Sequence, residues 1–112
     1  MSIIESGGLL VERCTKVKGT LKVGPYFPHN KAHLRQWVLI PFTIIRGAKD
    51  GVTLCITAGC HATEYAGIDA AIRLSRDTLT ENLKGNIIIV SLVNVPGFYE
   101  RNYINPIDGK NL

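Results

Sequence analysis

The chain has 112 residues, of which 46% are hydrophobic and 20% are charged, and its formal net charge is +4. This length and composition suit one domain with a single core and exclude an intrinsically disordered chain. The 13 basic residues form no run of like charge, and no apolar stretch approaches the roughly 18 residues of a membrane-spanning helix, so we expect neither a nucleic-acid nor a membrane partner.

The first half of the chain has the pattern of β-strands separated by turns. Residues 1–24 alternate in short stretches, which predicts one or two strands around Gly19. A proline-rich polar loop follows, and residues 34–46 predict a strand in which Pro41 requires a sheet edge or a bulge. Asp50-Gly51 then predicts a tight turn, so the strands on its two sides are expected to form a hairpin.

The second half predicts a strand, a helix and a second strand. Residues 52–58 and 86–93 are continuous apolar runs, typical of parallel strands buried on both faces, and Cys55 is expected in the core. Between them, Thr63 is a candidate N-cap for a helix from about Glu64 to Asp77. The predicted apolar stripe of this helix consists of Tyr65, Ile68, Ala71 and Ile72.

These elements predict an α/β fold with a mixed sheet. The strand–helix–strand segment is a βαβ unit, which places its two strands parallel with a right-handed crossover. Hairpin strands from residues 9–46 are expected along one edge of the sheet. After Val93, Pro96 and Gly97 end the pattern, and the remainder through Leu112 is expected to be a polar loop.

His61 and Glu64 lie where the first apolar strand gives way to the helix. Their spacing brings both side chains to one side of a helical turn, at the strand end where open α/β folds bind ligands. Imidazole nitrogen and carboxylate oxygen both bind zinc, and Gly59 allows a sharp turn before them. The pair therefore predicts a zinc site. The alternative is that Glu64 only favours the helix N-terminus and His61 is an ordinary loop residue.

Other side chains offer weaker alternatives. The three cysteines are an odd number without a CxxC spacing, which predicts reduced thiols and a cytoplasmic protein. Cys60 beside His61 is a candidate nucleophile of a cysteine hydrolase, although no second group is visible to activate it. His29 and His33 have a spacing that suits metal ligands on a helix, but the neighbouring prolines and polar residues favour a loop.

Two segments resemble those of a known family. ITAGCHATEYAGIDAAIRL (residues 56–74) resembles the metal-binding segment of the succinylglutamate desuccinylase and aspartoacylase family, which shows Ala-Gly-x-His-Gly-x-Glu before a helix. NVPGFYERNYINPIDGKNL (residues 94–112) is similar to the family's segment with an arginine and Pro-x-Asp-Gly-x-Asn-Leu after the second core strand. One departure is Ala62, where the family commonly has glycine.

The resemblance implies the N-terminal part of a zinc carboxypeptidase-like three-layer fold. It implies that His61 and Glu64 are zinc ligands and that Arg101, within a residue or two of register, binds the substrate. Asp108 and Asn111 are expected to shape the turn near the end of the segment. The implied reaction is the zinc-dependent hydrolysis of the amide bond of a small N-acylated amino acid.

In the family, the similar segment is followed by an Asn-Arg pair, a third histidine ligand and a glutamate general base, which have no counterpart in these residues. Residues 1–112 are therefore expected to be the N-terminal portion of a catalytic domain, to bind zinc weakly and to be inactive alone. Uncovered apolar surface is expected to favour a homo-oligomer. The alternative is a non-catalytic βαβ interaction or assembly module.

Overall fold

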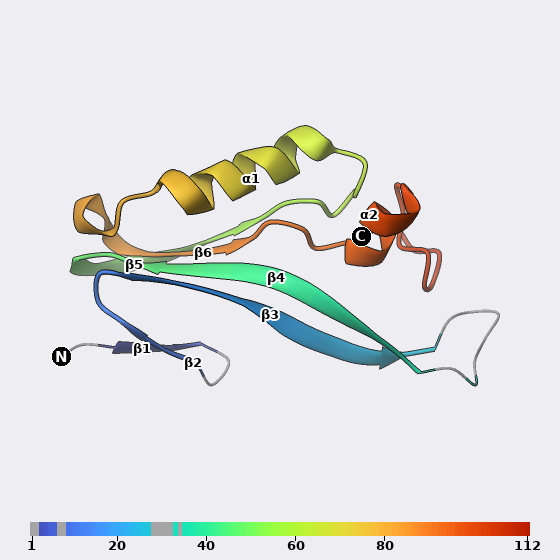
Figure 1. Cartoon of the computed structure of the whole chain (residues 1–112), viewed down its shortest axis with the longest axis horizontal. Coiled ribbons are helices and arrows are strands. Elements are labelled where there is room, and N and C mark those ends of the chain that lie inside the picture. Colours follow the sequence, from blue (N-terminus) through green and yellow to red (C-terminus); the bar gives the residue numbers. More distant parts are fainter. Residues whose placement is uncertain (1–2, 7–8, 28–32, 34) are drawn as a thin grey trace.

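The computed structural model describes residues 3–6, 9–27, 33 and 35–112, and its long axis measures 50 Å. Helix α1 covers one face of a sheet, and a small hairpin lies against the other (Figure 1). The elements in chain order are β1 (Ile3–Ser6), β2 (Leu9–Glu12), β3 (Thr15–Tyr26), β4 (Gln36–Arg46), β5 (Lys49–Thr57), α1 (Tyr65–Asp77), the 3-10 helix η1 (Thr80–Asn82), β6 (Lys84–Val90) and α2 (Val95–Glu100). Among the helices of these described residues, none has the length and apolar character of a membrane span.

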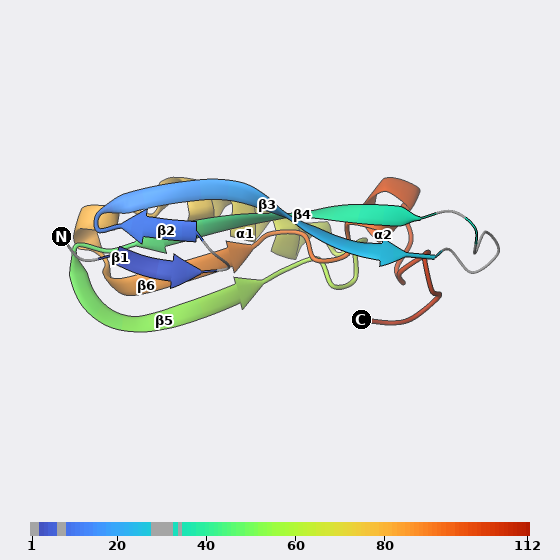
Figure 2. The same cartoon turned by 90° about the horizontal axis from the view of Figure 1, so that it is seen from below.

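The main sheet has four strands in the order β3-β4-β6-β5. Strand β4 pairs antiparallel with both β3 and β6. Strands β5 and β6 pair parallel, and α1 lies in the connection between them. Strands β1 and β2 form a separate antiparallel pair, which Figure 2 shows lying across the sheet face opposite α1. The prediction of a mixed α/β sheet with a βαβ unit is confirmed.

The hairpin predicted around Asp50-Gly51 is wrong, because β6 lies between β4 and β5. At the end of β4, the Gly47 N–H donates to Gly85 O at 2.8 Å, and the Ala48 N–H donates to Leu83 O at 3.0 Å. These bonds turn the chain around the start of β6, so that β5 begins on the far side of that strand. Asp50 and Gly51 consequently lie inside β5.

Strand β5 is exposed, which contradicts its predicted burial on both faces. It is the edge strand of the sheet, and the buried residues that pack against α1 come from β4 and β6. Val52 is 83% exposed, Leu54 is 54% exposed, and the predicted core residue Cys55 is exposed as well. An apolar run therefore predicted the strand correctly but not the elements beside it.

The core lies between α1 and the two central strands. It is formed by Ile45 from β4, Ala71 from α1 and Ile89 from β6. The predicted stripe of α1 is only partly buried, since Ile68 and Ala71 are buried whereas Tyr65 and Ile72 are about half exposed. Val11 of β2 and Ile44 of β4 are also buried.

Of the predictions made for two prolines, the one for Pro41 is confirmed and the one for Pro96 is wrong. Pro41 pairs with Thr20 of β3 but lies beyond the part of β4 that pairs with β6, which confirms the predicted edge position. Pro96 lies in the first turn of α2, where the predicted polar loop is wrong. A proline in a first helical turn costs no helical hydrogen bond, and Asn94 caps the helix by accepting from the Gly97 N–H at 3.1 Å.

The start of α1 also differs from the prediction. The helix begins at Tyr65 with Glu64 as its N-cap residue, and no side chain caps it, so the candidate cap Thr63 is wrong. The helix ends at Asp77 as predicted.

Asp50 links three segments of the fold and gives a pH-dependent prediction. Arg13 Nη2 lies 2.8 Å from its Oδ1, and Arg46 Nη2 lies 3.6 Å away. The hydrogen bond from Arg13 is the main cause that lowers the pKa of Asp50 below its ordinary value. The Asp50 carboxylate therefore contributes stability that is fully present above its ordinary pKa of 3.8 and is lost as the pH falls through its lowered folded-state pKa. Asp50→Asn should therefore lower the melting temperature slightly at pH 7 and leave it unchanged near pH 2, as measured by circular dichroism.

The matched control for Asp50→Asn is Asp69→Asn, which removes an exposed carboxylate from α1. Its effect at pH 7 should be the smaller of the two. A loss for Asp50→Asn that is the same at both pH values would contradict an ionic role for Asp50.

Candidate metal centre

Gly59 directs the chain from β5 toward the site. Its φ of +69° lies in the left-handed region, and a Cβ there would lie 2.8 Å from Leu92 Cδ1 and 3.1 Å from Ile68 Cγ1. The Asn94 N–H donates to Gly59 O at 3.0 Å, which ties this turn to the segment after β6. Glycine is thus required both by its backbone conformation and by the close packing, and the next residues project at the carboxyl end of β5.

His61 and Glu64 meet at this end of the sheet. The Glu64 N–H donates to His61 O at 3.0 Å, which closes the turn before α1. As a result, His61 Nδ1 lies 3.1 Å from Glu64 Oε1. The His61 side chain is 25% exposed and that of Glu64 is 66% exposed, so both can be reached from solvent. The two predicted residues therefore lie together and face a common point.

Two residues of the segment after α2 complete the surroundings of His61. His61 Nε2 donates to Asn111 Oδ1 at 2.7 Å, across 50 positions of sequence. The Tyr103 ring stacks on the imidazole with centroids 4.0 Å apart and planes inclined by 22°. Asp108 shapes the turn as predicted, accepting from the Lys110 N–H at 3.0 Å. Asn111 contacts His61 instead, and no sequence pattern predicted the contact of Tyr103 with His61.

These contacts favour the protonated form of His61. The hydrogen bond to Asn111, and next that to Glu64, raise the pKa of His61 above its ordinary value. In this form, each ring nitrogen carries a proton and donates to an oxygen. A cation at the shared point would replace the Nδ1 proton, so its binding would weaken as the pH falls.

His61 and Glu64 offer a nitrogen and an oxygen donor of the kinds that zinc binds. With bonds of about 2.0–2.1 Å, neighbouring ligands of a tetrahedral zinc lie about 3.3 Å apart. The 3.1 Å between His61 Nδ1 and Glu64 Oε1 is close to this separation. Asn111 Oδ1 accepts the Nε2 proton, which leaves the Nδ1 lone pair of a neutral ring for a metal. Within the described residues, no group of three His, Cys, Asp or Glu side chains gathers around a metal position.

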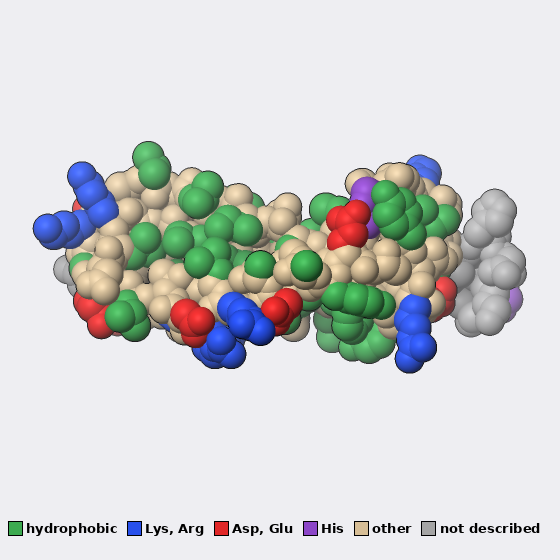
Figure 3. All heavy atoms as spheres, turned by 90° about the horizontal axis from the view of Figure 1, so that it is seen from above, with side chains coloured by type: hydrophobic (Ala, Val, Ile, Leu, Met, Phe, Trp, Pro, Cys, Tyr) green, Lys and Arg blue, Asp and Glu red, His purple; other side chains and the backbone are tan. Residues whose placement is uncertain are grey.

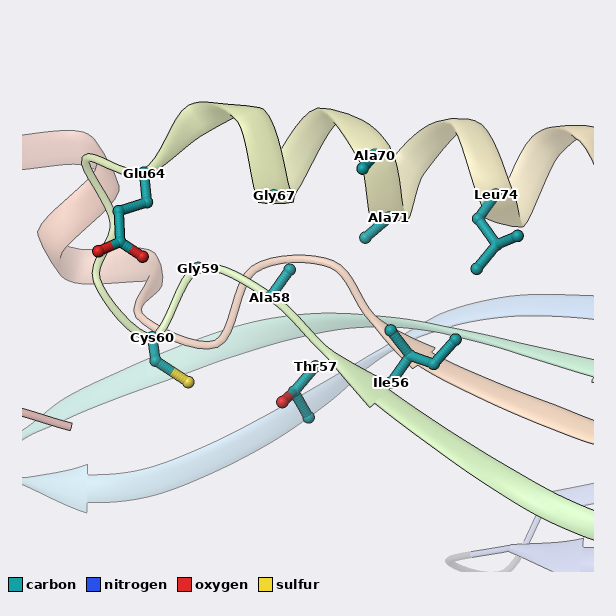
Figure 4. A pocket seen from close by; sticks show the side chains of 10 residues that line it. All are labelled: Ile56, Thr57, Ala58, Gly59, Cys60, Glu64, Gly67, Ala70, Ala71 and Leu74. Carbon is teal, nitrogen blue, oxygen red and sulfur yellow. The ribbon is translucent and has the colours of Figure 1, made fainter.

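The remaining site predictions have different outcomes. Arg101 ends α2 with a left-handed backbone (φ 53°, ψ 39°) and an exposed side chain, so its substrate role stays a prediction. His33 is exposed, and His29 lies outside the described residues. The cysteine alternative finds no support, because Glu64 and Asn111 engage both His61 nitrogens, and Figure 4 shows the Cys60 side chain directed away from the Glu64 carboxylate.

A shallow groove of about 390 Å³ runs from Glu64 along α1, and His61 is not among the residues that line it. Its apolar wall includes Ala58, Ala71 and Leu74 (Figure 4). On the same face of the molecule, a histidine and an acidic side chain lie side by side with apolar side chains around them (Figure 3). Next to Glu64 in the chain, the Tyr65 ring meets the Phe98 ring edge to face at 6.0 Å. The pair is thus an exposed polar site within an apolar surface.

The fold and the site define an α/β protein with a histidine–glutamate pair at the carboxyl end of a parallel strand. The catalytic domain of succinylglutamate desuccinylase and aspartoacylase is the family whose model matches residues 50–112. The chain belongs to this family.

Individual relatives agree with this membership. The chain is 37% identical over 75 residues to the N-alpha-acetyl-L-2,4-diaminobutyric acid deacetylase of Halomonas elongata, covering 67% of this chain and 22% of the relative. A succinylglutamate desuccinylase/aspartoacylase structure from Rhodobacter sphaeroides aligns with a TM-score of 0.72 and 26% identity, over 90% of this chain and 31% of that one. A succinylglutamate desuccinylase structure from Silicibacter sp. TM1040 aligns with a TM-score of 0.71 and 33% identity, over 86% and 28%. The chain therefore spans less than a third of the length of these relatives.

Proposed function

We propose that this chain carries part of the active site of a zinc-dependent deacylase, which hydrolyses the amide bond of an N-acylated amino acid. The observation that carries the proposal is the 3.1 Å separation of His61 Nδ1 and Glu64 Oε1 at the end of β5. Membership of the family supports the reaction class, since the similar proteins are named as a deacetylase and a desuccinylase of amino-acid derivatives.

Each residue of the pair has a defined part in this proposal. His61 would bind zinc through Nδ1, and Glu64 would bind through its carboxylate, whose charge offsets part of the charge of the cation. When bound, zinc would lower the pKa of its water to about 7 and polarise the amide carbonyl. Asn111 would keep the proton of His61 on Nε2 throughout, so that the ring presents the correct nitrogen.

Arg101 is proposed to bind the carboxylate of the amino-acid substrate. A guanidinium group recognises a carboxylate through paired N–H donors, and the exposed side chain of Arg101 is accessible to such a ligand. A third zinc ligand and a general base are not assigned to any described residue. We therefore propose that the 112 residues alone bind zinc weakly and do not turn over substrate.

The second candidate, a non-catalytic βαβ interaction module, is favoured by one observation. Strand β5 presents exposed apolar side chains, with Val52 and Leu54 more than half exposed. An exposed apolar edge strand is a surface for pairing with another chain. This candidate requires no metal, so zinc binding separates it from the deacylase.

The test measures zinc content after dialysis, together with hydrolysis of N-acetyl and N-succinyl amino acids at about pH 8, where competition by protons is small. We expect zinc to be retained weakly and removed by a chelator, with no hydrolysis by the 112-residue chain. Alkylation of the cysteines should leave zinc binding intact. Absence of any zinc binding would favour the interaction module, and sustained hydrolysis would show that these residues contain a complete site.

A further inference from the structure

Tyr103 has no role in the proposed reaction, although its ring covers one face of the His61 imidazole. The centroids are 4.0 Å apart and the planes are nearly parallel. His61 lies at the end of β5 and Tyr103 lies after α2, so the stack joins two distant segments. A stacked aromatic pair contributes beyond the burial of its area, which makes this contact a candidate for fixing the ring.

The hydrogen bonds of His61 leave one motion of its ring unrestrained. Asn111 holds the Nε2 edge at 2.7 Å, and Glu64 lies 3.1 Å from the Nδ1 edge. These two contacts fix the positions of Nδ1 and Nε2, but they still permit the ring to rotate about the axis through the two nitrogens, which tilts its plane. A flat group against the face of the ring prevents the tilt, and Tyr103 is such a group.

The segment that carries Tyr103 is itself held by hydrogen bonds. Asn102 Oδ1 accepts from the Ile104 N–H at 3.2 Å, directly beside Tyr103. Further along, the Asn105 N–H donates to Lys110 O at 2.9 Å, and Asn105 Oδ1 accepts from the Ile107 N–H at 3.0 Å. These bonds give the tyrosine ring a fixed support, so the stack can restrain the imidazole.

We propose that Tyr103 is a positioning residue for His61. Its ring fixes the tilt of the imidazole, so that Nδ1 is directed toward the point shared with Glu64 before a metal ion arrives. The contact operates through the aromatic face and does not require the tyrosine hydroxyl. This inference rests on the proposed zinc site and assigns a residue outside the ligand pair to its assembly.

The test compares Tyr103→Leu, which removes the ring, with Tyr103→Phe, which keeps it. The matched control is Tyr99→Leu, since Tyr99 is an exposed tyrosine whose ring contact is with Phe98. In the metal-free 112-residue chain, the NMR signals of the His61 ring protons report the stack through the ring current of Tyr103. Titration with zinc chloride, followed by the same signals, then gives the zinc affinity.

We expect Tyr103→Leu to remove the ring-current shift and to weaken zinc binding about 3- to 10-fold, which corresponds to the usual worth of an aromatic pair. Tyr103→Phe should keep both the shift and the affinity within about twofold, and Tyr99→Leu should change neither. Dispersed amide signals in each variant verify that the chain is folded.

The other outcomes overturn the inference in distinguishable ways. If wild-type His61 does not respond to zinc, the zinc site and the role of Tyr103 fail together. If Tyr103→Leu loses the shift but binds zinc as tightly as wild type, the positioning role fails and the zinc site stands. If Tyr103→Phe weakens binding as much as Tyr103→Leu, the hydroxyl acts instead of the ring, and the proposed mode of action is wrong.

Discussion

Replacing His61 with alanine should lower the zinc affinity of the chain about 100-fold or more. The substitution removes the only nitrogen ligand of the proposed site and leaves Glu64 as a single carboxylate, 66% exposed to water. Loss of a residue that merely orients a ligand typically costs 10- to 100-fold in metal affinity, so loss of the ligand itself should cost at least the upper value. Isothermal titration with zinc chloride would measure the change.

The matched control for His61→Ala is His33→Ala. His33 is an exposed histidine, so its removal tests for nonspecific binding of zinc to surface imidazoles. It should leave the affinity unchanged. Equal losses for the two variants would show that zinc binds to this chain without a defined site, and the deacylase proposal would then lose its structural support.

Ile45→Ala should destabilise the fold by about 2–5 kcal/mol, the range found when a large apolar side chain is removed from a core. Ile45 is fully buried and contacts the cluster that joins α1 to β4 and β6. Because this cluster has few buried members, little other apolar surface can close around the cavity. Urea denaturation, followed by circular dichroism, would give the change in the free energy of unfolding.

Ile72→Ala provides the comparison on α1 itself. Ile72 belongs to the same predicted apolar stripe, but it is 48% exposed in the structure. Its replacement should change the free energy of unfolding by less than about 1 kcal/mol, since surface substitutions usually have small effects. A cost for Ile72→Ala as large as that for Ile45→Ala would mean that α1 packs through a different face.

Predictions that depended on neighbouring residues were the most successful. The spacing of His61 and Glu64 predicted that both side chains meet, and they do so because one hydrogen-bonded turn before α1 separates them. The helix to Asp77 and the βαβ unit followed from hydrophobic periodicity, which is a local property. The same local information could not give the strand order, because the Gly47 bond to Gly85 depends on residues far along the chain.

The surroundings of His61 show the same limit at the site. Asn111 and Tyr103 reach the imidazole from a segment many residues away, and nothing in their own sequence neighbourhood indicates that contact. The Pro-x-Asp-Gly pattern indicated a turn, and Asp108 does shape one. A long-range contact of this kind becomes visible only when the turn and the end of β5 are placed in one structure.

The hydrogen bond between His61 and Asn111 has a consequence for stability. It joins the end of β5 to a residue 50 positions further along. An ion bound at Nδ1 would reinforce this link, because it would favour the same ring orientation that Asn111 requires. Binding of the ion would therefore act as a reversible cross-link, so that the melting temperature of the C-terminal segment would rise with the metal concentration.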